Sequence, residues 1–158
     1  MELYTIHTPE QKKILRSTCT PFDFTRYTKK EVREIVKEMR MRMHEWNGIG
    51  LAATQIGRTE QFFVAQPPQG KFYAIFNPKI TKTEGKPVLM EEGCLSVPGE
   101  YGEVARYEKL VIEGQDQNGK AIKIKAWGML AHIFQHESDH LRGVLYIDKS
   151  QKVNRLSS

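Results

Sequence analysis

The spacing of apolar residues predicts one long helix in the first third of the chain. Thr28 and Glu31 have the hydroxyl and carboxylate spacing of a capping box, which marks a helix start. Apolar residues then recur at steps of three and four: Val32, Ile35, Val36, Met39, Met43 and Trp46. We predict a helix over residues 29–46 whose methionines and Trp46 form a core-facing side rather than a ligand stripe.

Two more helices are expected nearer the ends. Thr8, Pro9 and Glu10 have the hydroxyl, proline and acid order of a helix start. Residues 126–141 return to helical spacing, and Gly143 is placed to end that helix. Lys152–Ser158 is polar, so we expect a frayed end.

Between about residues 60 and 125 the pattern changes to short β-rich runs bounded by Gly, Pro and Asn. These runs are Gln61–Ala65, Phe72–Phe76, Lys109–Glu113 and Lys120–Lys125. Asp116–Gly119 predicts a hairpin turn, because Asn-Gly readily adopts the positive φ angles of such turns. The expected fold class is α+β, with antiparallel strands.

Composition agrees with one soluble domain. The chain has 158 residues, of which 39% are hydrophobic and 27% charged. No run approaches the roughly 20 apolar residues of a membrane span, and no secretory signal follows Met1. A cytoplasmic location is expected, or an organelle if a transit peptide was removed. Cys19 and Cys94 are then expected as free thiols.

The net charge of +5 favours polyanionic neighbours. The basic residues are spread along the sequence, however, and the aromatic residues do not interleave with them. We therefore expect no specific nucleic-acid partner.

A metal site is indicated by the run His136-Glu137-Ser138-Asp139-His140. Its two histidines lie one helical turn apart, where both can bind one ion. Glu137 is rotated away from them but can reach a water on the metal, as a general base does. The alternative is a pair of exposed histidines on an ordinary helix.

Two histidines make a weak site, so a third protein ligand is expected. Cys94 is the best candidate, because Gly93 before it permits close approach to another element. Alternatively, Cys94 is a small buried filler. Cys19 has no such surroundings and is interpreted as structural, while His7 and His44 are interpreted as surface residues.

A run of small and apolar residues, Gly48–Gln55, ends in a single amide. It lacks the lysine of a phosphate-binding loop. Extended backbone beside a ligand, with Gln55 donating to a developing oxyanion, is the functional interpretation. A buried turn followed by a strand is the structural one.

Together, Gly48–Gln55, Glu92–Ser96 and Gln135–Leu141 closely resemble, in order and spacing, the three motifs of the peptide deformylase family. The resemblance extends from about Met39 to Asp148 and includes Arg106 and Gly143-Val144-Leu145. It implies an α+β fold in which short antiparallel strands pack around a central helix with the His136–His140 motif, and an N-terminal helix. Residues 1–158 would form a single catalytic domain.

The resemblance also implies the reaction, which removes the formyl group from N-terminal formylmethionine and releases formate. Cys94, His136 and His140 would hold one divalent ion, usually Fe²⁺ in the family and replaceable by Zn²⁺, Ni²⁺ or Co²⁺. Metal-bound hydroxide would attack the formyl carbon, with Glu137 as general acid and base. The Gln55 side chain and the Leu95 backbone N–H would stabilise the oxyanion.

By the same resemblance, the substrate-binding residues are Ile49, Gly50, Met90, Glu92, Met129, His132 and Ile133. Gly50 would bond the peptide backbone, and Arg106 would support the site by pairing with Glu92. His132 departs from an otherwise apolar wall and could instead join the coordinating face. The expected partners are nascent formylmethionyl peptides and, transiently, the ribosome, with no membrane contact and a monomeric enzyme.

Two other functions share part of these motifs. A zincin-like peptidase would have His136, Glu137 and His140 but would not need Cys94. A family member that only binds peptides would tolerate the loss of Glu137.

Overall fold

The computed structural model describes residues 1–156 and confirms the three predicted helices. They are α1 (Pro9–Leu15), α2 (Lys29–Glu45) and α3 (Gly128–His140). Short 3-10 turns are η1 (Phe24–Arg26), η2 (Ala53–Ile56) and η3 (Tyr146–Asp148). Among residues 1–156, no helix is both long and apolar enough to cross a membrane.

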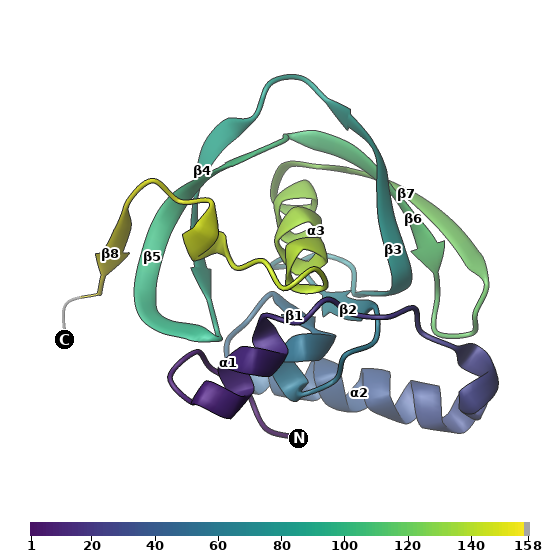
Figure 1. The fold of residues 1–158 in the computed structure, drawn as a ribbon. Coiled ribbons are helices and arrows are strands. Elements are labelled where there is room, and N and C mark those ends of the chain that lie inside the picture. The colour runs from purple at the N-terminus through teal and green to yellow at the C-terminus, as the bar shows by residue number, and fades with distance from the viewer. Residues whose placement is uncertain (157–158) are drawn as a thin grey trace.

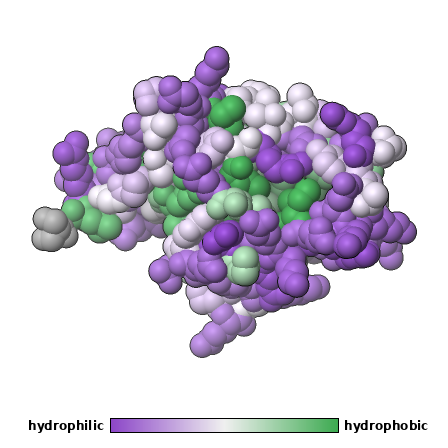
Figure 2. Space-filling view, turned by 90° about the horizontal axis from the view of Figure 1, so that it is seen from below, coloured by the Kyte–Doolittle hydropathy of each residue, from purple (hydrophilic) through white to green (hydrophobic). Residues whose placement is uncertain are grey.

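Helix α2 begins and packs as its sequence predicts. The Thr28 hydroxyl accepts from the Glu31 backbone N–H at 3.1 Å, and the Glu31 carboxylate accepts from the Thr28 N–H at 2.7 Å. Met39 and Met43 are fully buried, so the methionine side is core. Seen from the side of α1 and α2, the molecule is mostly hydrophilic, with apolar atoms gathered near the middle (Figure 2).

The predicted strands belong to a five-stranded antiparallel sheet in the order β1-β2-β3-β6-β7. Its strands are β1 (Gly50–Ala52), β2 (Phe62–Ala65), β3 (Tyr73–Glu84), β6 (Lys109–Gln115) and β7 (Ala121–Trp127). The hairpin turn between β6 and β7 is present, with φ of 78° at Gly119. Asn118 is not among the residues with positive φ in the described chain, so the glycine alone meets that requirement.

A second sheet has three strands in the order β4-β5-β8: β4 (Val88–Cys94), β5 (Val97–Arg106) and β8 (Val153–Arg155). The prediction of a frayed end is wrong for Val153–Arg155, which pairs with Glu100–Gly102 of β5. Backbone hydrogen bonds to a strand edge can order a polar segment without an apolar pattern. The last two residues of that prediction, 157 and 158, lie outside the described part of the chain.

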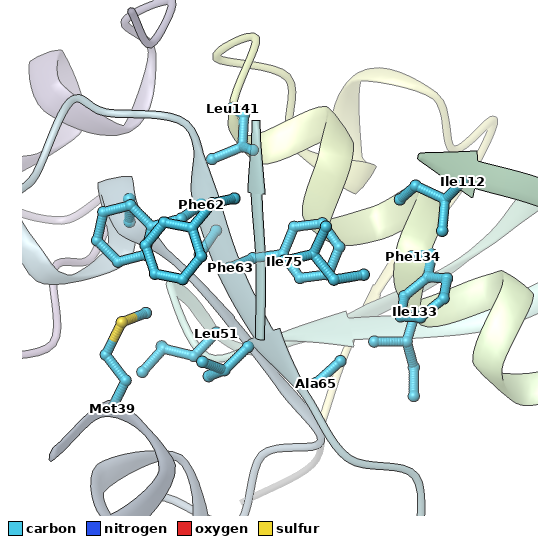
Figure 3. Close-up of a cluster of buried hydrophobic side chains, with 14 of the residues drawn as sticks. Met39, Leu51, Phe62, Phe63, Ala65, Ile75, Ile112, Ile133, Phe134 and Leu141 are labelled. Atoms are coloured by element: carbon cyan, nitrogen blue, oxygen red, sulfur yellow. The ribbon is translucent and has the colours of Figure 1, made fainter. Parts of the chain in front are cut away.

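Helix α3 lies between the two sheets, beneath the arch formed by β3 and β4 (Figure 1). Phe134 and Ile133 of α3 join a large apolar core, which also contains Phe62, Phe63 and Ile75 (Figure 3). The α3 helix ends at His140, slightly before the predicted end. Gly143 follows with φ of 74° and lies against the Arg16 backbone, where a side chain would clash.

On the other side of α3, the apolar cluster is much smaller. Its buried members are Val97, Val104, Leu145 and Tyr146. The segment that carries Cys94 is therefore attached to α3 largely by polar contacts, and these contacts build the site described next.

Candidate metal centre

Three donor atoms from two elements meet beside α3. Cys94 ends β4, where the pairing with β5 shifts register after Gly93, and His136 and His140 lie one turn apart on α3. Their donor atoms all lie within 4.8 Å of one another. The Cys94 Sγ is 3.4 Å from the His140 Nε2, which is 3.2 Å from the His136 Nε2.

These separations fit a single metal ion. Ligand atoms at the usual metal–nitrogen and metal–sulfur distances stand about 3.3 to 3.6 Å apart in a tetrahedron. One thiolate and two imidazoles suit several divalent ions, including Zn²⁺ and Fe²⁺. The residues present therefore fit a catalytic site that leaves one position for water or substrate.

The proton positions on the imidazoles also suit metal binding. The Glu92 carboxylate can only accept, so His136 donates to it from Nδ1, at 2.6 Å, and leaves its Nε2 free for the metal. Burial would lower the pKa of His136, but its hydrogen bonds with Cys94 and Glu92 outweigh burial and raise that pKa, so a metal at Nε2 would displace a proton there. Burial lowers the pKa of His140. His140 is therefore held in the neutral form that a metal requires.

Glu92 belongs to a buried ionic network that joins β4, β5 and α3. Arg106 donates to both Glu92 oxygens, at 2.6 and 3.0 Å, and to Asp139 at 2.6 Å. Burial would raise the pKa of Glu92, but hydrogen bonds from His132, His136 and Arg106 outweigh it and lower that pKa. The predicted pair of Glu92 and Arg106 is thus present and almost fully buried.

Glu137 lies beside the ligand group but is not part of it. Burial raises the pKa of Glu137 to about 7. Within residues 1–156 its Oε2 has no hydrogen-bond partner. A Cβ at Gly50 would clash with this carboxylate, so the missing side chain at position 50 makes room for Glu137. This contact concerns the space beside Gly50, and the bond between the Gly50 main chain and a peptide stays a prediction.

Gln55 is held at both ends of its amide, by the end of β1 and by the segment after β4. Its Oε1 accepts from the Ala52 N–H at 2.9 Å. Its Nε2 donates to the Ser96 Oγ at 3.1 Å and faces the Cys94 Sγ at 3.6 Å. The amide donor therefore lies beside Cys94, and the predicted donation from Gln55 to an oxyanion stays a prediction.

The other predicted site residues differ in their exposure. Ile49 and Met129 are 40% and 53% exposed, respectively, whereas Ile133 is buried. Met90 and Leu95 are half-buried. His132 does not join the ligand group; its Nε2 instead contacts Glu92 at 2.8 Å.

The residues assigned no metal role lie away from the ligand group. Cys19 is buried in the apolar core, and burial raises its pKa to about 11, as suits a structural thiol. His7 and His44 are exposed, as predicted. Both cysteines are free within the described chain.

Sequence reasoning missed three residues of the site. Asp139 contacts Arg106, Arg142 and Lys149, and Ser96 is fully buried against Gln55. Tyr146 stacks on the His136 ring with centroids 6.4 Å apart. Asp139 could have been found from its place three residues after His136, which puts both on one helix face; Ser96 and Tyr146 gave no such signal.

Two imidazoles and a thiolate that fit one ion, beside an uncoordinated carboxylate with a raised pKa, define a metal-dependent hydrolase. Residues 3–156 match the family model for polypeptide deformylase. The chain belongs to the peptide deformylase family, and its activity is that of a peptide deformylase.

Relatives of known sequence and structure share this fold across most of the chain. A peptide deformylase of Halothermothrix orenii is 43% identical over 141 residues, which cover 89% of each chain. The crystal structure of the Synechococcus elongatus enzyme, in complex with actinonin, has a TM-score of 0.86 and 33% identity, covering 96% of this chain and 79% of that one. The Thermotoga maritima enzyme has a TM-score of 0.83 and 30% identity, covering 99% and 97%.

Proposed function

We propose that the chain acts on N-terminal formylmethionine of newly made polypeptides and releases formate and a free amine. The observation that carries this proposal is the ligand trio of Cys94, His136 and His140, with the Glu137 carboxylate beside it. The trio distinguishes this site from a peptidase with the same paired histidines, because such an enzyme does not need Cys94.

Cys94, His136 and His140 would hold the metal. A bound divalent ion supplies Lewis acidity, which polarises a carbonyl and brings the pKa of water to around 7. We propose Fe²⁺ as the ion used in the cell, with Zn²⁺, Ni²⁺ or Co²⁺ as substitutes, because a mixed thiolate and imidazole set accepts all of these.

Glu137 is proposed as the residue that moves protons. With a pKa near 7, its carboxylate is close to half-protonated at neutral pH. It can therefore accept a proton from the attacking water and deliver it to the departing amine.

Gln55 and Leu95 are proposed to bind the developing oxyanion. The Gln55 amide is held in place by Ala52 and Ser96, so only its N–H that faces the Cys94 Sγ would change partner to donate to the oxyanion. The Leu95 backbone N–H, next to Cys94, would supply a second donor. Removing one such donor commonly costs about 10²- to 10³-fold in turnover, which is the loss we expect for Gln55→Ala.

The methionine side chain would be held by a mainly apolar group of residues. We assign this role to Ile49, Met90, Met129, His132 and Ile133, with Gly50 bonding the peptide backbone. The exposed apolar surface of Ile49 and Met129 supports the assignment, because it would be covered by a bound apolar side chain. Glu92 and Arg106 support the site from behind.

Transient contact with the ribosome is proposed through the outer face of β3, β6 and β7. Strand pairing places Lys82 and Lys125 on either side of Val111, and Lys109 beside Trp127. Trp127 is 70% exposed, and the lysines are exposed as well. Folding therefore gathers basic residues that are dispersed in the sequence onto one face, which suits the phosphates of RNA.

Co-sedimentation with ribosomes at increasing salt tests this face. Charge reversal at Lys82, Lys109 and Lys125 should weaken binding much more than the same reversal at Lys29, Lys30 and Lys37 of α2. Equal effects would exclude the β3-β6-β7 face.

The remaining assignments concern the protein as a whole. We propose that residues 1–158 act as a single catalytic domain and as a monomer. We also propose that the enzyme works in the cytoplasm, where both free cysteines would stay reduced.

Formate release from a formyl-Met peptide, with the matched acetyl-Met peptide as control, tests the proposed substrate. Only the formyl peptide should be cleaved, and Cys94→Ser should lose both the metal and the activity. Equal cleavage of both peptides, or cleavage at internal bonds, would point to the zincin-like peptidase. Unchanged function in Glu137→Ala would point to a peptide-binding protein.

A further inference from the structure

His132 makes a contact with Glu92 that neither metal coordination nor its proposed place beside the methionine side chain explains. It lies one turn before His136, and its side chain is 17% exposed. Its Nε2 is 2.8 Å from the Glu92 Oε2. Because a carboxylate only accepts, His132 must carry its proton at Nε2 and donate it to Glu92.

With this bond, each oxygen of the Glu92 carboxylate accepts two hydrogen bonds. Oε1 accepts from the His136 Nδ1 at 2.6 Å and from Arg106 at 3.0 Å. Oε2 accepts from Arg106 at 2.6 Å and from His132. Each oxygen therefore has one guanidinium donor from β5 and one imidazole donor from α3.

The symmetry of these contacts fixes the orientation of the carboxylate. Arg106 contacts both oxygens, and His136 contacts only one. Without His132, α3 would hold the carboxylate by a single oxygen, and only Arg106 would oppose rotation of Glu92 away from the His136 ring. With His132, two donors one helical turn apart hold both oxygens against the helix.

We propose that His132 is a positioning residue of the metal centre: it holds Glu92, and through Glu92 it fixes the ring of the metal ligand His136. The proposal rests on the metal site assigned under the proposed function. Partners that orient a metal-binding histidine typically contribute about 10- to 100-fold in metal affinity. His132 acts one bond further away, so we expect about 10-fold.

Competition for Co²⁺ against a chelator, followed by the absorption of the cobalt–thiolate site, measures this effect without catalysis. His132→Ala should weaken Co²⁺ binding about 10-fold. His132→Gln keeps an N–H donor of similar reach and should restore most of the affinity. His132→Asn is polar but too short and should behave like alanine. The control is His44→Ala, which removes an exposed histidine bonded to Gln66 and should leave Co²⁺ binding unchanged.

A double-mutant cycle decides whether the effect passes through Glu92. In a Glu92→Ala background, His132→Ala should weaken Co²⁺ binding by less than about 2-fold. An equal loss in both backgrounds would overturn the proposal, as would wild-type affinity in His132→Ala. If His132→Ala does not unfold cooperatively with temperature, His132→Gln and His132→Asn still test the proposal. Equal Co²⁺ affinity in these two variants would also overturn the positioning role.

The outcome is separable from that of the proposed function. A wild-type protein that binds Co²⁺ but releases no formate would refute the proposed function and leave the positioning role standing. A wild-type protein that binds no Co²⁺ would refute both.

Discussion

The two sides of α3 are stabilised by opposite means. Toward the five-stranded sheet, α3 contributes Ala131, Ile133 and Phe134 to a core of buried apolar side chains. Toward β4 and β5, it presents His136 and Asp139 to the buried charges of Glu92 and Arg106. Among residues 1–156, the apolar cluster on that second side has four buried members.

The two sides of α3 therefore serve different purposes: one stabilises the fold, and the other orients the residues of the metal site. Apolar burial stabilises in proportion to area and places few demands on orientation. Buried charges offer little net stability, because desolvation offsets their attraction, but each one fixes the direction of its partners. A metal site requires its ligands to be oriented. The ionic network therefore lies on the side of α3 that carries the ligands, and the large apolar core that stabilises the fold lies on the other side.

The largest expected effect is that of Glu137→Gln. The kcat should fall about 10²- to 10⁴-fold, because a glutamine cannot move a proton. The metal-free protein should at the same time become more stable above pH 7, by about 3 kcal/mol. The folded pKa of Glu137 is raised to about 7, so folding is progressively disfavoured as pH rises from the unfolded pKa to that value, and glutamine removes this penalty.

Formate release and thermal unfolding at pH 5 and pH 8 measure both quantities for Glu137→Gln. Loss of activity without a pH-dependent gain in stability would show that the carboxylate is not destabilised by its burial.

Arg106→Met should be strongly destabilising, by about 3–5 kcal/mol, because it leaves the Glu92 and Asp139 carboxylates buried without their shared cation. Urea unfolding measures the loss. The control is Arg155→Met, since Arg155 is exposed and 3.9 Å from Glu100; it should change stability by less than about 1 kcal/mol. Similar values for the two variants would contradict the role of the buried network.

Ile112→Leu tests the tolerance of the apolar side. Ile112 is fully buried in β6, and a change that conserves volume should cost less than about 1.5 kcal/mol in the free energy of unfolding, with formate release unchanged. Urea unfolding and the formyl-Met assay measure these two quantities. A loss as large as that of Arg106→Met would mean that the apolar core demands the same orientation as the ionic network.

Asp148→Asn has the smallest expected effect. Burial would raise the pKa of Asp148, but the hydrogen bond from Arg16 outweighs it and lowers that pKa. The pair therefore stabilises the fold above the unfolded pKa of the carboxyl group and loses this contribution as pH falls below it. Both side chains are partly exposed, so the effect should be under about 1 kcal/mol.

Thermal unfolding from pH 2 to pH 6 shows whether Asp148→Asn removes part of the acid dependence. An effect of several kcal/mol would place Asp148 with the buried network instead.

Much of the fold could be predicted because its signals are local. The capping box of Thr28 and Glu31 and the apolar spacing after it gave α2 to within one residue. Four strands of the five-stranded sheet, β2, β3, β6 and β7, were found because they are rich in β-branched and aromatic residues. Strands β4, β5 and β8 were missed, since charged and polar residues interrupt them and these strands are ordered by pairing with one another.

The catalytic constellation was already present in the amino-acid order. His136, Glu137 and His140 share one helix, so their spacing alone sets which of them can bind one ion and which cannot. Which partners hold them was a different matter. The structure shows that His132 contacts Glu92, that Arg106 pairs with Asp139, and that lysines dispersed in the sequence lie on one sheet face. Each of these contacts joins segments that are distant in the sequence. They depend on how the sheets pack around α3, and no local pattern encodes that packing.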